Sequence, residues 1–273
     1  MTMLALVQMN STQLVDRNFD TALLCVDEAI KNHAGLIVLP EHFLYIGPDK
    51  SVVFDLNAPQ INILREIARK SKTCICAGSF LERNPEGGKP FNTSVFIDAD
   101  GQITGIYRKI HLFDVEIHDS IECHESKYTA AGNKASLVKT PFATIGMTIC
   151  YDLRFPELYR LLALRGCDLI LVPSNFALQT GKDHWQVLLR ARAIENGVYI
   201  AAANQFGTKY DGNSSYGRSA VIDPWGITVA QAEDTQPAVV LCEINSKRTA
   251  EVRSRIPSLK HIKLFQDHAD GQY

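Results

Sequence analysis

Short, almost entirely apolar segments alternate with segments of helical periodicity along most of this sequence. The segment 35–40 contains Leu-Ile-Val-Leu and the segment 168–172 contains Leu-Ile-Leu-Val, and both are typical of strands buried on two faces. By contrast, the segment 17–32 repeats apolar residues at intervals of three and four from Phe19 to Ile30, which predicts an amphipathic helix. Buried strands that alternate with helices predict an α/β chain.

The same alternation continues through the second half of the chain. We expect strands at 4–9, 35–40, 74–80, 93–98, 103–107, 143–149, 168–172, 198–203, 218–222, 227–230 and 239–244, and helices at 17–32, 61–71, 156–165, 183–196 and 246–255. Asp100-Gly101 predicts a hairpin turn. No segment rich in Pro, Gly or Ser divides the chain, so we expect one domain over 1–273. The periodicity is compatible with both a barrel and a layered sandwich.

The composition argues against several classes of partner. The 273 residues are 46% hydrophobic, and 28 Lys and Arg stand against 30 Asp and Glu, for a formal net charge of −2. Because there is no basic excess, the chain lacks the electrostatic signature of nucleic-acid or anionic-membrane binding. No apolar run approaches the ~20 residues that span a bilayer. The first nine residues lack the charged and apolar regions of a signal peptide, so we expect a cytoplasmic protein.

The seven cysteines are an odd number and do not form a disulfide framework in a cytoplasmic chain. Cys74 and Cys76 are two apart, and His118, Cys123 and His124 lie within seven residues. Neither group has the paired spacing of a zinc site. We therefore expect no metal site, and we expect most of these thiols to be buried and inert.

Three residues whose side chains could take part in catalysis follow predicted strands. Glu41 comes directly after the strand 35–40, where loss of water would raise the pKa of its carboxyl toward that of a general base. The alternative is a helix N-cap or a surface carboxylate. Lys109 follows the strand 103–107 among apolar neighbours, where its ammonium could face an oxyanion or titrate as an acid. The alternative for Lys109 is a lysine in a basic surface loop.

Cys150 ends the strand 143–149 just before the helix 156–165, which Asp152 could cap. At such a turn, helix dipoles and backbone N–H groups would lower the pKa of the thiol. The alternative is a buried structural cysteine. Together with Glu41 and Lys109, Cys150 would supply the nucleophile, base and cation that nucleophilic acyl transfer requires. No glycine-rich phosphate loop competes with this interpretation.

Longer motifs resemble the nitrilase superfamily of carbon–nitrogen hydrolases over nearly the whole chain. The motifs are Leu39–Glu41, Tyr107–Asp114, Cys150–Glu157, Gly181–Trp185, Arg190–Asn196 and Gly217–Gly226. The resemblance implies a four-layer α-β-β-α sandwich that needs no metal or organic cofactor. It also implies a homodimer formed through the helix after the cysteine, here 155–165, whose Phe155 and leucines at 158, 161, 162 and 164 would supply an apolar surface.

The resemblance implies a catalytic triad in which Glu41 is the general base, Lys109 stabilises the oxyanion and Cys150 is the nucleophile. A second glutamate of the family matches Glu125, which would hold Lys109, whereas Glu116 is too close to the lysine. In the implied reaction, a thiolate attacks an amide carbonyl, ammonia leaves, and water hydrolyses the thioester. The backbone N–H of Tyr151 would share the oxyanion with Lys109.

The motif after Cys150 resembles the amidase branches, because true nitrilases typically carry Cys-Trp-Glu there. The nearest match is the group that contains ω-amidase and deaminated glutathione amidase. The resemblance implies hydrolysis of the terminal amide of a dicarboxylic monoamide, often an α-keto acid, with release of ammonia. The alternatives are an N-carbamoyl amidohydrolase, an aliphatic amidase, a nitrilase or a catalytically silent relative that binds small amides or proteins.

A carboxylate-bearing substrate needs a cation, and the planar guanidinium of Arg154 suits that contact. The alternative for Arg154 is an ion pair with Asp152 or Glu157. Other residues that we expect near the substrate are Tyr45, Tyr151, Phe176, Thr180 and His184. We expect the loops 45–50, 120–129 and 207–215 to set the pocket size.

Three more residues of the second half have structural interpretations. Trp185 could line the pocket or anchor the core. We expect Arg190 and Arg192 to form buried ion pairs with Glu195 rather than to contact the substrate.

Overall fold

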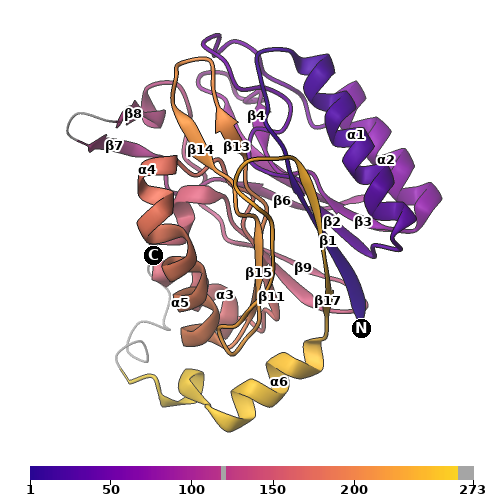
Figure 1. Ribbon diagram of the computed structural model, residues 1–273, viewed down its shortest axis with the longest axis vertical. Coiled ribbons are helices and arrows are strands. Elements are labelled where there is room, and N and C mark those ends of the chain that lie inside the picture. The colour runs from indigo at the N-terminus through magenta and orange to yellow at the C-terminus, as the bar shows by residue number, and fades with distance from the viewer. Residues whose placement is uncertain (118–120, 264–273) are drawn as a thin grey trace.

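A computed structural model describes residues 1–117 and 121–263 of the chain (Figure 1). His118, considered above as a metal ligand, and the C-terminal residues 264–273 lie outside the described residues. Two β-sheets face each other, with α1 (Val15–Lys31) and α2 (Pro59–Ser71) outside one sheet. α3 (Pro156–Leu164) and α5 (Gln186–Asn196) lie outside the other. The chain therefore forms four layers in the order α-β-β-α, as the resemblance implied.

The first sheet has parallel strands at its centre. Its path is β17 (Ala238–Ile244), β1 (Thr2–Gln8), β2 (Leu36–Val38), β3 (Cys74–Cys76), β5 (Phe91–Ile97) and β4 (Phe80–Glu82), with β6 (Ile103–Arg108) also paired to β5. β1, β2 and β3 run parallel, and β17, β5, β4 and β6 are antiparallel to their neighbours. The expected hairpin around Gly101 joins β5 to β6.

The second sheet repeats this plan. Its order is β16 (Thr228–Gln231), β15 (Ala220–Ile222), β12 (Tyr199–Ala202), β11 (Leu169–Leu171), β10 (Thr144–Met147) and β9 (Ser136–Lys139). β10, β11 and β12 run parallel and the other pairs are antiparallel. Parallel strands end at the same edge of a sheet, so the loops after them are brought together.

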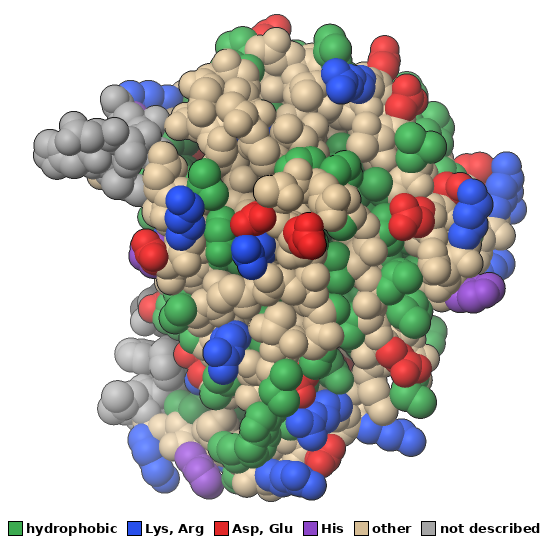
Figure 2. Space-filling view, viewed as in Figure 1, with side chains coloured by type: hydrophobic (Ala, Val, Ile, Leu, Met, Phe, Trp, Pro, Cys, Tyr) green, Lys and Arg blue, Asp and Glu red, His purple; other side chains and the backbone are tan. Residues whose placement is uncertain are grey.

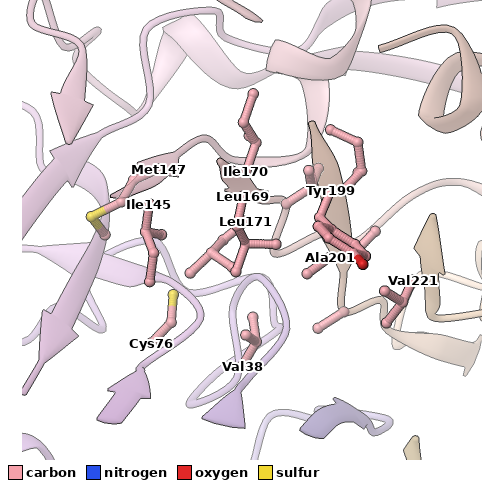
Figure 3. Packing of buried hydrophobic residues seen from close by; sticks show 14 of the residues in the cluster. Val38, Cys76, Ile145, Met147, Leu169, Ile170, Leu171, Tyr199, Ala201 and Val221 are labelled. Carbon is pink, nitrogen blue, oxygen red and sulfur yellow. The ribbon is translucent and has the colours of Figure 1, made fainter. Parts of the chain in front are cut away.

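The strands of the first sheet alternate between two cores because successive side chains point to opposite faces. Leu36 and Val38 of β2 belong to the core between the sheets, whereas Ile37 belongs to the core under α1 and α2. Figure 3 shows Val38 and Cys76 opposite side chains of β10 and β11, such as Ile145 and Leu171. Burial on both faces explains why these strands read as unbroken apolar runs.

The predicted strands and helices all correspond to elements of the structure within a few residues, except that the strand 74–80 divides into β3 and β4. Two hairpins that we did not predict, β7 (Asp114–Ile117) with β8 (Ile121–His124) and β13 (Phe206–Thr208) with β14 (Ser214–Tyr216), extend from one end of the sandwich (Figure 1). β9 was also not predicted. α6 (Ser246–Arg255) follows β17. Within the described residues, no helix is long and apolar enough to cross a membrane.

The apolar surface expected on the helix 155–165 is narrower than predicted. Leu158 and Leu162 of α3 are buried in the chain's own core, and Leu161 and Leu164 are exposed at 38% and 52%. The helical period explains this, because residues four apart share the face that packs on the sheet.

Charged side chains of both signs are interspersed over the face shown in Figure 2, and no large patch of one sign is visible there.

Candidate active site

Glu41, Lys109 and Cys150 come together although they lie far apart in the sequence. Glu41 follows β2, Lys109 follows β6, and Cys150 opens the short 3₁₀ helix (Cys150–Arg154) after β10. All three are buried and line one cavity of about 110 Å³. The site therefore draws one residue from the second sheet and two from the first.

The ammonium of Lys109 lies between two buried carboxylates. Its Nζ donates to Oε1 of Glu41 at 3.0 Å and to Oε2 of Glu125 at 2.9 Å. Lys109 is only 2% exposed. A buried ammonium is tolerated when charged acceptors of this kind compensate it. Glu125 itself is fixed by the backbone N–H of Phe113 at 2.7 Å.

Asn92 of β5 links the two glutamates and was not singled out from the sequence. Its Nδ2 donates to Oε1 of Glu41 at 2.9 Å and to Oε1 of Glu125 at 3.2 Å. The reverse amide orientation would place Oδ1 against two carboxylates, so the contacts determine the orientation. Oδ1 of Asn92 is buried without a partner among the described residues. No local signal identifies such a residue, because it lies inside an ordinary buried strand.

The backbone at Cys150 holds the thiol in a sharp turn. Cys150 has φ of +44°, in the left-handed region that side chains disfavour. Its N–H donates to Pro173 O at 2.9 Å, and its thiol lines the same cavity as the Glu41 carboxylate. The expectation that Asp152 caps α3 is wrong. Asp152 instead accepts from Ile149 N at 2.8 Å and thereby closes the turn around Cys150.

Asp152 also connects the cysteine turn to the lysine loop. Its carboxylate accepts from the Tyr107 hydroxyl at 2.7 Å and from the backbone N–H of His111 at 3.2 Å, and it lies 2.7 Å from His111 Nδ1. Tyr107 and His111 flank Lys109 in the sequence. One fully buried carboxylate thus fixes both segments relative to each other.

The electrostatics of the site differ from the sequence expectation. Burial raises the pKa of Glu41, but the Lys109 ammonium outweighs it and leaves this pKa below its usual range. Burial and the Glu41 carboxylate raise the pKa of the Cys150 thiol well above its usual value. The predictions of a raised carboxyl pKa and a lowered thiol pKa are therefore wrong. The pKa of each group is influenced by a charged partner that is distant in the sequence, namely Lys109 for Glu41 and Glu41 for Cys150.

Lys109 does not titrate as an acid in this setting. Burial lowers its pKa, but Glu125 and Glu41 together raise it well above the usual value. At neutral pH the resting site thus holds an ammonium, an ionised Glu41 and a neutral Cys150 thiol.

The 110 Å³ cavity brings most of the expected substrate-binding residues beside Cys150. Tyr151, Arg154, Phe176 and Thr180 all line it. Arg154 has no ion pair with Asp152 or Glu157 within the described residues, and its guanidinium lies 5.3 Å from the Phe176 ring centroid. His184 does not line the cavity, but its Nδ1 lies 3.2 Å from Nη1 of Arg154.

A second cavity of about 360 Å³ adjoins the first. Tyr45 lines this outer cavity rather than the inner one. The loops 45–50 and 207–215 form much of its wall, and Cys123 and His124 of β8 line it as well. Cys123 lines both cavities and is thus an exception to the expectation of inert packing thiols.

The structural interpretations of Trp185, Arg190 and Arg192 have different outcomes. Trp185 is fully buried and donates through Nε1 to Arg218 O at 2.9 Å, so it anchors the core. Arg192 is buried and pairs with Glu195 at 3.1 Å, as expected. The same prediction for Arg190 is wrong, because Arg190 is exposed and donates to Gly226 O at 2.8 Å.

Glu41, His42 and Glu125 are close enough together to form a metal-ligand set. However, Lys109 and Asn92 already donate to both carboxylates. A cation placed there would meet the Lys109 ammonium as a neighbour of like charge. The residues therefore fit a lysine-centred charge cluster better than a metal.

Residues 3–254 match the family model described as carbon-nitrogen hydrolase. The chain belongs to this family. It is a hydrolase that acts on carbon–nitrogen bonds other than peptide bonds, and the resemblance stated from the sequence motifs is confirmed.

Named relatives of this carbon–nitrogen hydrolase cover nearly its whole length. A deaminated glutathione amidase of Synechocystis is 39% identical over 263 residues, which are 94% of this chain and 96% of the relative. Omega-amidase NIT2 of Mus musculus is 37% identical over 262 residues, which are 94% of this chain and 93% of the relative. The crystal structure of Saccharomyces cerevisiae Nit3, described as a member of branch 10 of the nitrilase superfamily, superposes with a TM-score of 0.84. It is 30% identical and 94% of each chain is covered.

Proposed function

We propose that this hydrolase cleaves the terminal amide of a small carboxylate-bearing acid through a thioester on Cys150, with release of ammonia. The observation that carries the proposal is the buried Lys109 ammonium held between Glu41 and Glu125 beside a strained cysteine turn. The relatives named deaminated glutathione amidase and omega-amidase support an amide as the substrate.

In the first half of the reaction, Glu41 acts as general base. The neutral Cys150 thiol and the ionised Glu41 carboxylate line the same cavity and interact electrostatically, so the proton moves to Glu41 as sulfur attacks the amide carbonyl. The negative charge that develops on the carbonyl oxygen lies against the Lys109 ammonium and the backbone N–H of Tyr151. Such oxyanion donors each contribute roughly 10²–10³ in rate.

Collapse of the tetrahedral intermediate breaks the C–N bond. Glu41 returns the proton to the departing nitrogen, and ammonia leaves with the acyl group bound to Cys150 as a thioester. Glu41 then removes a proton from water, which attacks the thioester and frees the acid and the thiol. Glu125 does not touch the reacting atoms in this scheme and acts by holding Lys109 in place.

Arg154 is the candidate for binding the substrate carboxylate. It lines the same cavity as Cys150 and has no carboxylate partner within 4.0 Å among the described residues. A guanidinium without a counter-ion in a partly apolar cavity attracts a carboxylate strongly, because the contact is charge-assisted and bidentate. Tyr151, Phe176 and Thr180 would surround the rest of the acyl group.

The whole chain would act as one catalytic domain, because its site combines residues from both sheets. A homodimer through α3 is supported by exposed Leu161 and Leu164, and exposed Val187 and Ile194 lie on neighbouring α5. Sedimentation velocity tests this assembly. A cytoplasmic location fits a mechanism that requires Cys150 as a reduced thiol.

Ammonia release from succinamate, the monoamide of succinic acid, tests the proposed reaction. We expect turnover by the wild-type protein and none by Cys150→Ala with a native circular dichroism spectrum. Cys167→Ala is the matched control, since Cys167 is a buried core thiol away from the cavity. Wild-type-like turnover by Cys150→Ala would refute the proposal.

A further inference from the structure

His42 follows Glu41 in the chain and takes no part in the reaction described above. Its side chain is 22% exposed and lines both the inner and the outer cavity. The backbone turns sharply here, because φ of His42 is +56°, in the left-handed region that most side chains disfavour. The backbone N–H of His42 donates to Ser79 Oγ at 3.1 Å. The turn therefore holds the imidazole beside the catalytic residues.

The contacts of the imidazole indicate which of its nitrogens carries the proton. Nδ2 of Asn92 lies 3.4 Å from Nε2 of His42. The same amide nitrogen donates to the carboxylates of Glu41 and Glu125, so it is the NH₂ end of the side chain and can only donate. Nε2 of His42 is therefore the acceptor in this contact, and the resting imidazole is neutral with its proton on Nδ1.

A proton on Nε2 would reverse these interactions. Nε2–H would then face the NH₂ group of Asn92, so that two donors would meet without an acceptor. The carboxylate within reach is that of Glu41, whose Oε1 lies 4.0 Å from Nε2. A small rotation of the ring would bring the imidazolium into a charge-assisted hydrogen bond with this oxygen. Glu41 would then be paired with two cations, Lys109 and His42, and would be a poor proton acceptor.

The charged groups that face His42 come from four segments of the chain. They are Glu41 beside it, Lys50, Lys109 and Glu125. Burial lowers the pKa of the imidazole, the two glutamates raise it and the two lysines lower it, and the net effect is a pKa below the usual value. The imidazole is consequently neutral at neutral pH and gains its proton in acidic solution.

The other groups of the site keep their protonation state over the same range of pH. Burial raises the pKa of Glu41, but Lys109 lowers it to about 2 overall. Burial and Glu41 raise the pKa of Cys150 well above its usual value. Cys123 and Tyr128 also line both cavities, and burial raises the pKa of each. Of the titratable residues that line both cavities, His42 is thus the one that gains charge in acidic solution.

We propose that His42 is a positioning residue for the general base. Its neutral imidazole accepts from Asn92 and leaves Glu41 free to take the proton of the thiol, whereas the imidazolium pairs with Glu41 and stops the first step. This inference rests on the proposed function, which assigns Glu41 as the base. His42 touches no reacting atom and acts through the side chains of Asn92 and Glu41.

The pH dependence of succinamate hydrolysis tests this role. The measured quantity is the ratio of kcat/KM at pH 8 to kcat/KM at pH 4. His42→Gln keeps an acceptor for Asn92 but has no group that ionises. Because activity falls about tenfold for each pH unit below the pKa of a controlling group, we expect the wild-type ratio to exceed that of His42→Gln by about tenfold or more. The titration of succinamate itself is common to both proteins and cancels in this comparison.

The matched control is His33→Gln. His33 also has a positive φ, +59°, but it is exposed and lines neither cavity. This variant should keep the wild-type ratio. His42→Asn is a second test variant, since asparagine tolerates a positive φ, and it should behave as His42→Gln does. Native circular dichroism spectra at both pH values are required of every variant.

NMR spectroscopy of the histidine side chains measures the titration of His42 directly. Its imidazole resonance is assigned by its loss in His42→Gln or His42→Asn. We expect the midpoint of this titration in the free wild-type protein to coincide with the midpoint of the acid limb of kcat/KM, which reports a group of the free enzyme.

The outcomes separate this inference from the proposed function. Succinamate turnover with the same ratio in wild type, His42→Gln and His42→Asn would overturn the role of His42 and leave the proposed function standing. An imidazole midpoint clearly different from the kinetic midpoint would also overturn it, because another group would then control the acid limb. If the wild-type protein hydrolysed no succinamate at any pH, both proposals would fall.

Discussion

Replacing Glu125 by Gln tests whether the second glutamate controls the charge on Lys109. Three donors converge on Glu125, from Lys109 at 2.9 Å, Phe113 at 2.7 Å and Asn92 at 3.2 Å. A glutamine whose oxygen faces Lys109 and Phe113 turns its NH₂ toward the Asn92 amide, so one buried donor loses its acceptor. That loss and the weaker contact to the ammonium predict a decrease of roughly 2–4 kcal/mol in the free energy of unfolding.

The same substitution should slow the chemistry. With one carboxylate neutralised, the Lys109 ammonium is attracted to Glu41 alone, which weakens Glu41 as a proton acceptor. We expect kcat for succinamate to fall by about 10²-fold, the lower end of what a positioned acid–base group contributes. Urea denaturation and ammonia release measure the two effects.

The matched control is Glu116→Gln, which makes the same change at the exposed glutamate nearer to Lys109 in the sequence. It should leave both quantities close to wild type. If Glu125→Gln kept kcat within about threefold of wild type, the argument that Glu125 positions Lys109 for charge stabilisation would be refuted.

Three further substitutions probe the surroundings of the triad. Arg154→Ala should lower kcat/KM about tenfold or more for succinamate but much less for propionamide, and an equal loss for both would make Arg154 structural. Burial raises the pKa of Glu41 but Lys109 lowers it overall, so the stability from its ionised form is present above the ordinary carboxyl value and is lost as pH falls toward the folded pKa. The urea-derived stability of Glu41→Gln should consequently decline less than that of wild type between pH 6 and pH 3, and parallel declines would contradict this account. Asn92→Ala removes the donor shared by two carboxylates and should lower kcat roughly tenfold with little change in KM, whereas a change confined to thermal stability would argue against a positioning role.

The layers of the fold were predictable from local patterns together with the resemblance. The apolar segment 36–38 is buried on both faces, and such segments identify central strands without any knowledge of their neighbours. Periodicity alone did not distinguish a barrel from a sandwich, and the family resemblance made that choice. The β7–β8 and β13–β14 hairpins were missed because their strands are only three or four residues long and contain no continuous apolar run.

The candidate site was predictable as a set of residues but not as an electrostatic system. Glu41, Lys109 and Cys150 each follow a strand, and strand ends of an α/β fold gather at one edge. The direction in which the pKa of each group shifts depends on contacts between residues that are far apart in the sequence. Glu41 and Lys109, for example, are separated by 68 residues. Burial alone raises the pKa of a carboxyl, so reasoning without the lysine gave the wrong sign. Asn92 escaped notice for the same reason, because its role depends wholly on distant partners.

Mass spectrometry of the acyl-enzyme is the most direct test of the thioester mechanism. The protein is mixed with succinamate, quenched with acid within milliseconds to seconds, and its intact mass and peptide map are recorded. The account predicts a succinyl adduct on the peptide that contains Cys150, its accumulation before steady-state release of succinate, and its absence in Cys150→Ala. Turnover in which no adduct forms on Cys150, or an adduct on a different residue, would contradict it.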